Sequence, residues 1–482
     1  MPLRLFWALL FAATLSSYTA DLTPGRKAAL DHISARSLEG HISFLASDAL
    51  EGRDTPSTGL DIAAEYIASQ FRRAGLKPAG DDGYFQTAPF IVSEHSSAAA
   101  KLTVESGDSE LALEHNNLRV IWAEKLEFSD VVPIKVNTTN VTSETIEGKL
   151  VLIPLRRANG LGAALRALGK AKPAAVLLVQ STAINGPEVR SRLDEAGEQP
   201  KFTVVRISNP DLYKMVTDAK PGEMDAKVSL RLEPRTQRIV DLKNVAGILP
   251  GSDPALADQY VLLTAHYDHI GVKPSGDGDR IYNGANDDAS GVASVIEIAQ
   301  ALSAARSAPR RSILFMTYFG EEKDLLGSAF YARHPLVPLV RTVADLNLEQ
   351  LGRTDGDYPA GTATITGFDF SDVTAALKIA GAATGVKIED PGKNGDAFFA
   401  RSDNLSLADR GIPSHTLAVD FEFSDYHQVG DEWKKLDYAN LEKVDRTIAL
   451  TAIMIADNPE PPHWNESHAK TQPYIKAQRE LK

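Results

Sequence analysis

Histidine and acidic residues follow apolar, strand-like runs at five places in the second half of the chain. The candidate ligands are His266, Asp268 and His269 after the first run, then Asp287-Asp288, Glu321-Glu322, Glu349 and His427. Open α/β sheets bind ligands at the carboxyl ends of their strands, so we expect these side chains to converge on one edge. Several carboxylates buried together need countercharge, which metal ions supply.

Each of these features has an ordinary explanation when it is taken alone. A single histidine after a strand is usually structural. The pair Asp287-Asp288 precedes a predicted helix, where acidic residues commonly cap the first turn. A pair such as Glu321-Glu322 usually lies on a solvated face. The coincidence of five such features at five strand ends favours a metal site instead.

The chain contains no cysteine, which excludes disulfides, thiolate metal sites and a cysteine nucleophile. With only nitrogen and oxygen ligands available, zinc is the predicted metal. Two histidines and three carboxylates give three ligands to each of two ions if one carboxylate bridges them. Paired ions about 3.5–4 Å apart recur in hydrolases, and a water between them supplies hydroxide near neutral pH. The prediction is two Zn²⁺ per chain.

The spacing also separates ligands from acid–base groups. Side chains of adjacent residues in extended chain diverge, so one member of the pair Glu321-Glu322 can ligate while the other accepts a proton from water. Asp268 lies two residues after His266, where it can accept the second imidazole N–H and fix its tautomer. This reasoning leaves open which glutamate has which role.

The elements that position these residues alternate between strand-like and helix-like segments from about residue 241 to 455. Strand-like runs occur at residues 260–264, 312–317 and 342–348. Apolar residues at helical spacing lie between the first two: Val292, Val295, Ile296, Ala299 and Leu302. Such alternation predicts an α/β sheet with helices on both faces.

The regions outside this block have different patterns of apolar and polar residues. Residues 27–75 are predicted to be helical from Ile62, Tyr66, Ile67 and Phe71, and Gly75 marks a helix stop. The polar tail from Pro459 onward is expected to be loosely attached.

Residues 90–240 read as a non-catalytic, β-rich module. Short strand-like runs occur at residues 150–153, 175–179 and 202–205, with a predicted helix at 162–168. No acidic cluster lies beside the histidines of this block.

The composition bears on partners and compartment. Fifty-one basic and 64 acidic residues among 482 give a net charge of −13, which argues against nucleic acid as a partner. The apolar run 5–13, after a short basic start, predicts a secretory signal peptide ending near Ala20. No other stretch predicts a membrane span. Secretion without disulfides indicates a bacterial periplasm or exterior, while the oligomeric state stays open.

Taken together, the motifs resemble the secreted two-zinc aminopeptidase family of the zinc exopeptidases, which also includes glutamate carboxypeptidases and transferrin-receptor-like proteins. The resemblance rests on residues 266–271, 283–291, 320–322 with 327–328, 347–349, 426–427, 401–404 with 411–413, and 44–53. It implies an α/β fold with a three-layer mixed sheet of zinc-exopeptidase type (phosphorylase/hydrolase-like).

The same resemblance implies a domain plan. A signal peptide covers residues 1–20, and the zinc peptidase domain is split between 21–90 and 241–458. An inserted β-rich protease-associated domain covers 91–240, and a polar tail covers 459–482.

By resemblance, the metal ligands divide into two sets. His266 and Glu349 are implied to hold one zinc, Glu322 and His427 the other, and Asp287 is implied to bridge them. The family usually has Asp at the position of Glu349, so this zinc can sit differently here.

The resemblance also assigns the acid–base chemistry. Glu321 is implied to be the general base and Asp268 the partner of His266. Asn404 stands where the family usually has His, and His269 and His415 are interpreted as structural.

The implied function is that of a zinc-dependent exopeptidase. An aminopeptidase would remove amino-terminal residues from peptide substrates through a hydroxide that bridges two zinc ions. The alternative is a zinc carboxypeptidase or dipeptidase, in which Arg401 or Arg353 holds the substrate carboxylate. A non-catalytic ectodomain is disfavoured because every ligand position and the base are occupied. Glutaminyl cyclase chemistry is disfavoured because those proteins normally lack the inserted module.

Overall fold

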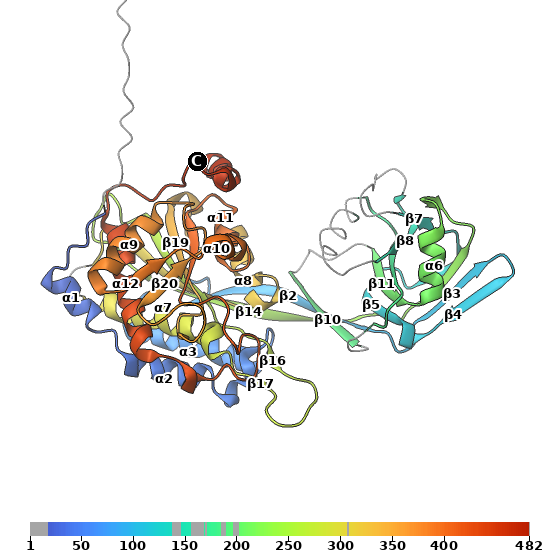
Figure 1. Ribbon diagram of the computed structural model, residues 1–482, viewed down its shortest axis with the longest axis horizontal. Coiled ribbons are helices and arrows are strands. Elements are labelled where there is room, and N and C mark those ends of the chain that lie inside the picture. The colour runs from blue at the N-terminus through green and yellow to red at the C-terminus, as the bar shows by residue number, and fades with distance from the viewer. Residues whose placement is uncertain are drawn as a thin grey trace, which may run out of the picture. The chain divides into compact units, whose positions relative to one another are not determined.

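The computed structural model describes residues 18–136, 146–155, 168, 171–184, 189–195, 202–305 and 308–481. The chain forms two compact units, Met1–Ala88 with Leu242–Lys482, and Pro89–Asp241 (Figure 1). The predicted signal peptide, residues 1–20, lies outside the described part except for its last three residues.

A mixed sheet forms the centre of the first unit. Within this unit the strand order is β14-β18-β15-β19-β22-β20-β21, and β1 pairs with β14. The strands are β1 (Lys77–Pro78), β14 (Thr236–Leu249), β15 (Tyr260–His266), β18 (Ser312–Tyr318), β19 (Thr342–Leu348), β20 (Thr362–Ile365), β21 (Lys387–Glu389) and β22 (Ser414–Ala418). The four neighbours β18, β15, β19 and β22 are parallel, whereas β14 runs antiparallel to β18 and β20 runs antiparallel to β22.

Helices cover both faces of these parallel strands. Successive side chains of a strand point to opposite faces. Leu262, Leu314 and Met316 pack with Tyr331 of α8 (Leu326–Arg333) and Leu407 of α11 (Asn404–Ala408) on one face. The intervening residues face α7 (Ser290–Ser303) and α12 (Tyr438–Asp457), which both contact β15. Burial on both faces explains the continuous apolar runs, and the predicted α/β class with a mixed sheet is confirmed.

Further helices surround this core. They are α1 (Pro24–Leu30), α2 (Ala35–Leu45), α3 (Thr58–Ala74), α9 (Val373–Thr384), α10 (Gly392–Phe398) and α13 (Gln472–Leu481). Helices α2 and α3 pack on α7, and α9 packs on α12. Across the described residues, no helix has both the length and the apolar character needed to cross a membrane.

Helix α3 illustrates how local signals determined one element. The Ser57 hydroxyl caps it by accepting from the Leu60 N–H at 3.1 Å, and Gly75 ends it with a left-handed φ of 78°. Its buried face contains Ile67 and Phe71 as expected. Ile62 is 42% exposed because it lies off that face.

The second unit contains two sheets. Their orders are β12-β7-β8-β9-β11-β5 and β4-β3-β13-β6. The strands are β3 (Lys101–Ser106), β4 (Ser109–Leu113), β5 (Leu118–Trp122), β6 (Glu127–Val131), β7 (Ile134–Lys135), β8 (Leu150–Pro154), β9 (Ala175–Gln180), β11 (Thr203–Ser208), β12 (Gly222–Glu223) and β13 (Lys227–Arg231). One apolar cluster joins side chains of both sheets and of α6 (Pro210–Asp218).

The strands predicted in this unit are present. The runs at 150–153, 175–179 and 202–205 correspond to β8, β9 and β11, which are parallel neighbours. Two longer strands, β2 (Phe85–Ser96) and β14, continue from one unit into the other, and β10 (Val189–Glu195) pairs with β2. The predicted helix at 162–168 lies outside the described residues except for Leu168.

The carboxyl-terminal tail is packed, which corrects the expectation of loose attachment. Trp464 is 4% exposed and its indole N–H donates to the Gly411 carbonyl at 2.9 Å. Ile475 of α13 belongs to the same apolar cluster as Phe370 and Phe399. The polar average of the tail concealed these few apolar anchors, whose burial stabilises the docked segment.

Asp345 of β19 makes stability depend on pH. It is fully buried, and it accepts hydrogen bonds from Thr264 Oγ1 at 2.9 Å and Ser414 Oγ at 2.6 Å. Burial raises the pKa of Asp345 from 3.8 to about 7. The folded protein therefore keeps this proton in a pH range where the unfolded chain has lost it.

We expect the free energy of unfolding to fall as pH rises from about 4 to 7, by on the order of 4 kcal/mol from this group. Asp345→Asn should remove that component, as denaturant unfolding at both ends of the range would measure. An unchanged difference between the two pH values in Asp345→Asn would contradict the assignment.

Candidate active site

Four parallel strands bring the predicted site residues to one edge of the sheet. His266 is the last residue of β15. Glu321 and Glu322 follow β18 after two residues, and Glu349 follows β19 directly. His427 lies in the loop after β22. Because these strands are parallel neighbours, their carboxyl ends meet at this edge.

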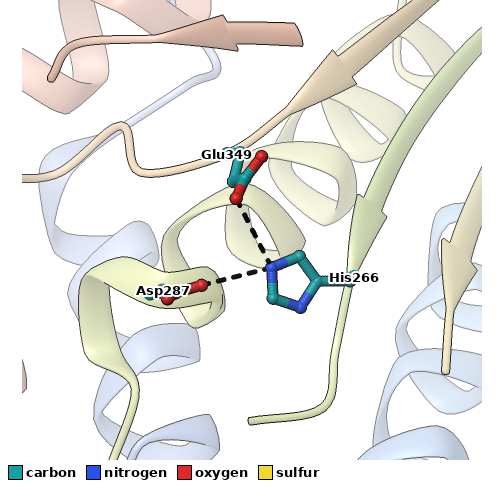
Figure 2. A group of neighbouring side chains, drawn as sticks. All are labelled: His266, Asp287 and Glu349. Carbon is teal, nitrogen blue, oxygen red and sulfur yellow. Dashed lines mark ion pairs between the residues drawn. The ribbon is translucent and has the colours of Figure 1, made fainter. Parts of the chain in front are cut away.

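One group of three donors contains His266, Asp287 and Glu349 (Figure 2). The His266 Nε2 atom lies 3.2 Å from Asp287 Oδ1 and 3.9 Å from Glu349 Oε1. All three side chains are buried. They come from the end of β15, the loop before α7 and the residue after β19, so only the folded chain brings them together.

A second group forms around the other oxygen of Asp287. Asp287 Oδ2 lies 3.1 Å from His427 Nε2, which is 3.3 Å from Glu322 Oε1. Asp287 thus directs one carboxylate oxygen to each group, as a bridging ligand would.

His269 also belongs to the second group. Its Nδ1 atom lies 2.8 Å from Glu322 Oε1 and 3.9 Å from Asp287 Oδ2. The interpretation of His269 as a structural residue does not account for this position. The available signal was its place three residues after His266, in the same loop.

The donor atoms of both groups fit metal ions. His266 Nε2, His269 Nδ1 and Glu322 Oε1 are buried, and they face one another or Asp287 in ion-pair contacts that lack hydrogen-bond geometry. An unsatisfied buried polar group costs about 1–3 kcal/mol, so such a concentration is unusual without a ligand. Imidazole nitrogens and carboxylate oxygens form a donor set that suits zinc.

Asp268 lies beside His266 Nδ1, whereas Asp287 and Glu349 lie beside His266 Nε2. The His266 Nδ1 atom is 3.6 Å from Asp268 Oδ1 and 3.2 Å from its carbonyl oxygen. The Asp268 carboxylate also accepts the Glu321 N–H at 3.0 Å and the Thr55 hydroxyl at 3.2 Å. It therefore orients His266 and the start of the Glu321 segment together.

The two acidic residues of the pair before α7 have different roles. Asp288 accepts from the N–H groups of Gly291 at 2.9 Å and Gln350 at 3.2 Å, so it tethers backbone. The N–H groups of Asn286 and Asp287 donate to Asp431. Asp431 was missed by sequence reasoning, because nothing in its local sequence relates it to the loop that it holds.

Glu321 borders a cavity of about 340 Å³. The other lining residues are Glu322, Asp324, Leu325, Ala400, Arg401 and Tyr426. Burial raises the pKa of Glu321 well above its usual range, and the negative charges of Glu349, Asp403 and Glu322 add to the effect against the opposing influence of His266. A carboxyl group of raised pKa beside a cavity is suited to general acid–base chemistry.

Arg53 is a buried residue that binds the backbone of the loops around the site. Its guanidinium donates to the carbonyls of Tyr267 at 2.8 Å, Asn283 at 2.7 Å and Gly284 at 2.9 Å, and also to that of Leu45. The first three carbonyls belong to the loops that carry the candidate ligands His266 and Asp287. Sequence reasoning placed Arg53 in a family-like stretch without giving it a role.

Arg53→Met should leave these carbonyls unpaired and destabilise the protein by on the order of 3 kcal/mol or more. We also expect lower zinc content, because both ligand loops lose their support. Thermal unfolding and metal analysis check this, with the exposed Arg36→Met as control. A variant as stable as the control would show that the loops hold their shape without Arg53.

The remaining candidate positions have separate environments. Arg353 is 4% exposed and pairs with Asp355 and Asp425, whereas Arg401 is exposed and lies over the Phe398 ring. Both ring nitrogens of His415 are hydrogen-bonded, to Ser371 Oγ at 2.6 Å and Thr366 O at 2.8 Å.

Asn404, at the position where the related proteins usually have His, is bound to backbone and hydroxyl groups. Its amide accepts from Thr416 Oγ1 at 2.8 Å and donates to the Phe399 carbonyl at 3.0 Å. These contacts tie α11 to β22.

Comparison with known families gives a match for the part of the chain that holds these residues. The model of peptidase family M28 matches residues 244–452. This region is a peptidase family M28 domain. The M28 match includes every candidate ligand from His266 to His427, and it confirms the predicted relationship to the zinc exopeptidases.

Curated relatives match parts of the M28 domain. A probable zinc metalloprotease of Pyrenophora teres is 34% identical over 121 residues, 24% of this chain and 24% of that protein. Probable leucine aminopeptidase 2 of Aspergillus oryzae is 30% identical over 193 residues, 39% of this chain and 34% of that protein. The chain thus spans about a quarter to a third of these relatives.

Solved structures show the same fold. An aminopeptidase from Aneurinibacillus sp. strain AM-1 has a TM-score of 0.59 at 21% identity, covering 90% of this chain and 97% of that chain. A zinc aminopeptidase from Bacillus subtilis has a TM-score of 0.51 at 19% identity, covering 87% and 94%.

The predicted bacterial origin is corrected by the curated relatives. The two relatives above are fungal, as are vacuolar membrane proteases of Phaeosphaeria nodorum and Aspergillus fumigatus. These relatives point to a eukaryotic origin, and the expected periplasmic location is corrected with it. The absence of cysteine, on which that expectation rested, does not distinguish the two origins.

Proposed function

We propose that the chain is a zinc-dependent aminopeptidase that removes amino-terminal residues from peptides and holds two Zn²⁺. The observation that carries this proposal is the position of Asp287, whose two oxygens face two separate groups of buried donors. The match to the M28 model and the titles of the related proteins support zinc peptidase chemistry.

The two metal positions share one ligand. His266, Asp287 and Glu349 would hold one ion, and Asp287, Glu322 and His427 the other. When bound, the ions supply Lewis acidity, which lowers the pKa of a water and polarises the scissile carbonyl. Glu349 places its carboxylate 3.9 Å from His266 Nε2 from the end of β19.

The chain's own residues carry the proton transfers. Glu321 accepts the proton of the attacking water and returns it to the leaving amine. Asp268 holds the His266 ring in the tautomer that leaves Nε2 free for the metal. The lining of the cavity by Glu321, Glu322 and Asp324 provides negative charge for the protonated α-amine of a peptide.

A carboxypeptidase or dipeptidase is the second candidate, and one observation favours it. Arg401 lines the same cavity as Glu321 and is the exposed arginine of the two considered from sequence. A guanidinium in this place can bind a substrate carboxylate in a bidentate manner.

A substrate panel separates the two candidates. Aminoacyl substrates with a free amine, peptides with a blocked amine, and peptides with an amidated carboxyl end are assayed before and after chelation and zinc addition. The aminopeptidase requires a free amine, tolerates amidation, and loses activity reversibly on chelation. Cleavage of amino-blocked peptides that disappears in Arg401→Ala would favour the second candidate, and activity that survives chelation would exclude both.

The block at 91–240 is proposed to be a protease-associated domain inserted into a peptidase domain that comprises residues 21–90 and 241–458. The compactness of Pro89–Asp241 and its β-rich sheets support this assignment. Within the described residues, the groups of potential metal ligands lie in the other unit.

A further inference from the structure

We infer that Arg401 binds the side-chain carboxylate of the substrate's amino-terminal residue, so that the enzyme prefers peptides that begin with aspartate or glutamate. The inference rests on the proposed aminopeptidase function, because it names the substrate class of the same site.

Arg401 supplies the positive charge in the space beside the general base. It lines the cavity of about 340 Å³ described above and a second, smaller cavity of about 30 Å³. Glu321, Arg401 and Tyr426 line both, so the arginine and the general base border the same space. Among the described residues that line either cavity, Arg401 is the only one with a cationic side chain. A negatively charged group of a substrate therefore has one counterpart here.

The Arg401 guanidinium lacks a carboxylate partner. It is exposed and forms no ion pair within the described part of the chain, where it contacts the Phe398 ring. Arg353, by contrast, pairs with Asp425 at 2.9 Å. Water satisfies an exposed arginine elsewhere on a protein surface, but a bound substrate displaces the water of this cavity. An acidic group on the substrate then supplies the partner that the protein does not.

Two aromatic rings hold the guanidinium in place. Its Cζ atom lies 4.7 Å from the centre of the Phe398 ring. Phe398 stacks on Phe421, with ring centroids 4.9 Å apart and planes inclined by 13°. The Arg401 N–H also donates to the Phe398 carbonyl at 2.9 Å. An arginine that packs on an aromatic face keeps its N–H groups available for a carboxylate, and its prior ordering lowers the entropy cost of binding.

The smaller cavity limits the side chain that it can accept. Its volume of about 30 Å³ is room for roughly two water-sized groups, which matches the two oxygens of a carboxylate. An aromatic side chain would require Phe398 or Phe421, which both line this cavity, to move. A short acidic side chain therefore satisfies both the volume and the charge.

The acidic wall of the larger cavity fits the other end of the same substrate residue. Glu322 and Asp324 line it together with Glu321. The protonated α-amine of a peptide is attracted to this wall, while a side-chain carboxylate is attracted to Arg401. An amino-terminal aspartate or glutamate carries both charges, whereas a neutral residue carries only the first. A lysine or arginine in this position would meet the like charge of Arg401 and is disfavoured.

The test compares substrates that differ by one charge. Aspartyl and asparaginyl p-nitroanilides, and the glutamyl and glutaminyl pair, have a free amine and no terminal carboxylate, so only the side chain can supply a negative charge. The zinc-loaded full-length chain should show a kcat/KM about 10-fold or more higher for the acidic member of each pair. Added salt should lower this ratio, because the guanidinium is exposed.

Variants of Arg401 identify the residue responsible. Arg401→Ala should bring the ratio close to one, and Arg401→Lys should retain part of it, because lysine keeps the charge without the planar fork. Arg410→Ala is the matched control and should keep the full ratio, since Arg410 is exposed and lines neither cavity. The ratio is informative even if a variant is less active, because a general loss affects both members of a pair.

A binding measurement gives a readout without turnover. Calorimetric titration of Glu321→Gln with the same substrates should show tighter binding of the acidic member of each pair. The double variant with Arg401→Ala should bind both members alike.

The outcomes separate this inference from the proposed function. If alanyl and leucyl substrates are cleaved and the acidic-to-amide ratio is near one, the acidic preference is refuted and the aminopeptidase stands. An acidic preference that persists in Arg401→Ala would refute the role of Arg401. If the zinc-loaded chain cleaves no substrate with a free amine, the proposed function fails and this inference fails with it.

Discussion

Glu321→Gln is expected to lower kcat by about 10²–10⁴-fold while the protein keeps both metal ions. Glutamine preserves the size of the side chain and the backbone N–H that donates to Asp268. It removes the carboxylate that accepts a proton from water. The closest donor contacts of both groups involve other residues, so the metal should remain.

The matched control is the neighbouring glutamate. Glu322→Gln should lower the metal content, because Glu322 Oε1 faces His269 and His427. Both variants are assayed for kcat and for zinc by elemental analysis. The reverse pattern, with metal lost in Glu321→Gln and kept in Glu322→Gln, would exchange the roles of the two residues.

Asp287→Ala is expected to abolish activity and to reduce zinc binding at both positions. Among the residues that the structure describes, no other residue directs an oxygen to each of the two donor groups. Removing it leaves His266 with Glu349 on one side, and Glu322 with His427 on the other. Two ligands hold zinc far less well than three.

The measurement is zinc stoichiometry together with thermal unfolding across zinc concentrations. Metal that binds only the folded chain stabilises it in proportion to ln(1 + [L]/Kd), and Asp287→Ala should lose most of this dependence. Asp288→Asn is the neighbouring control, because Asp288 contacts backbone N–H groups. Loss of only one ion in Asp287→Ala would show that Asp287 serves a single position.

Many of the determinants of the site could be predicted from sequence. His266, Glu321, Glu322 and Glu349 follow buried strands whose apolar runs are continuous, and parallel strands necessarily place their carboxyl ends at one edge. The α/β class followed from the same alternation of strands and helices. These apolar runs and their alternation depend only on residues close together in the chain, so a single sequence is enough to predict the strands and helices.

Other features depend on contacts between segments that lie far apart in sequence. Arg53 reaches the loop at Asn283, and Asp431 holds the loop at Asp287. The different roles of Asp287 and Asp288 are likewise decided by what each carboxylate meets, which is histidine for Asp287 and backbone N–H groups for Asp288. No periodicity or local motif encodes such pairings.

The tail and His269 show the same limit. The burial of Trp464 depends on an apolar partner surface that includes Phe399, and a polar average gives no indication of it. His269 was read as structural because a single histidine after a strand usually is.

The sequence by itself determined the types of ligand, the exclusion of thiolates, and the strand ends at which the ligands lie. The tertiary structure decided which oxygen of Asp287 faces which group, and that His269 lies beside Glu322. The physical reason is that residue type sets which atoms can act as ligands, and strand order sets the edge of the sheet at which those atoms lie. Side-chain direction depends on loop backbone, which Arg53 and Asp431 hold from distant parts of the chain.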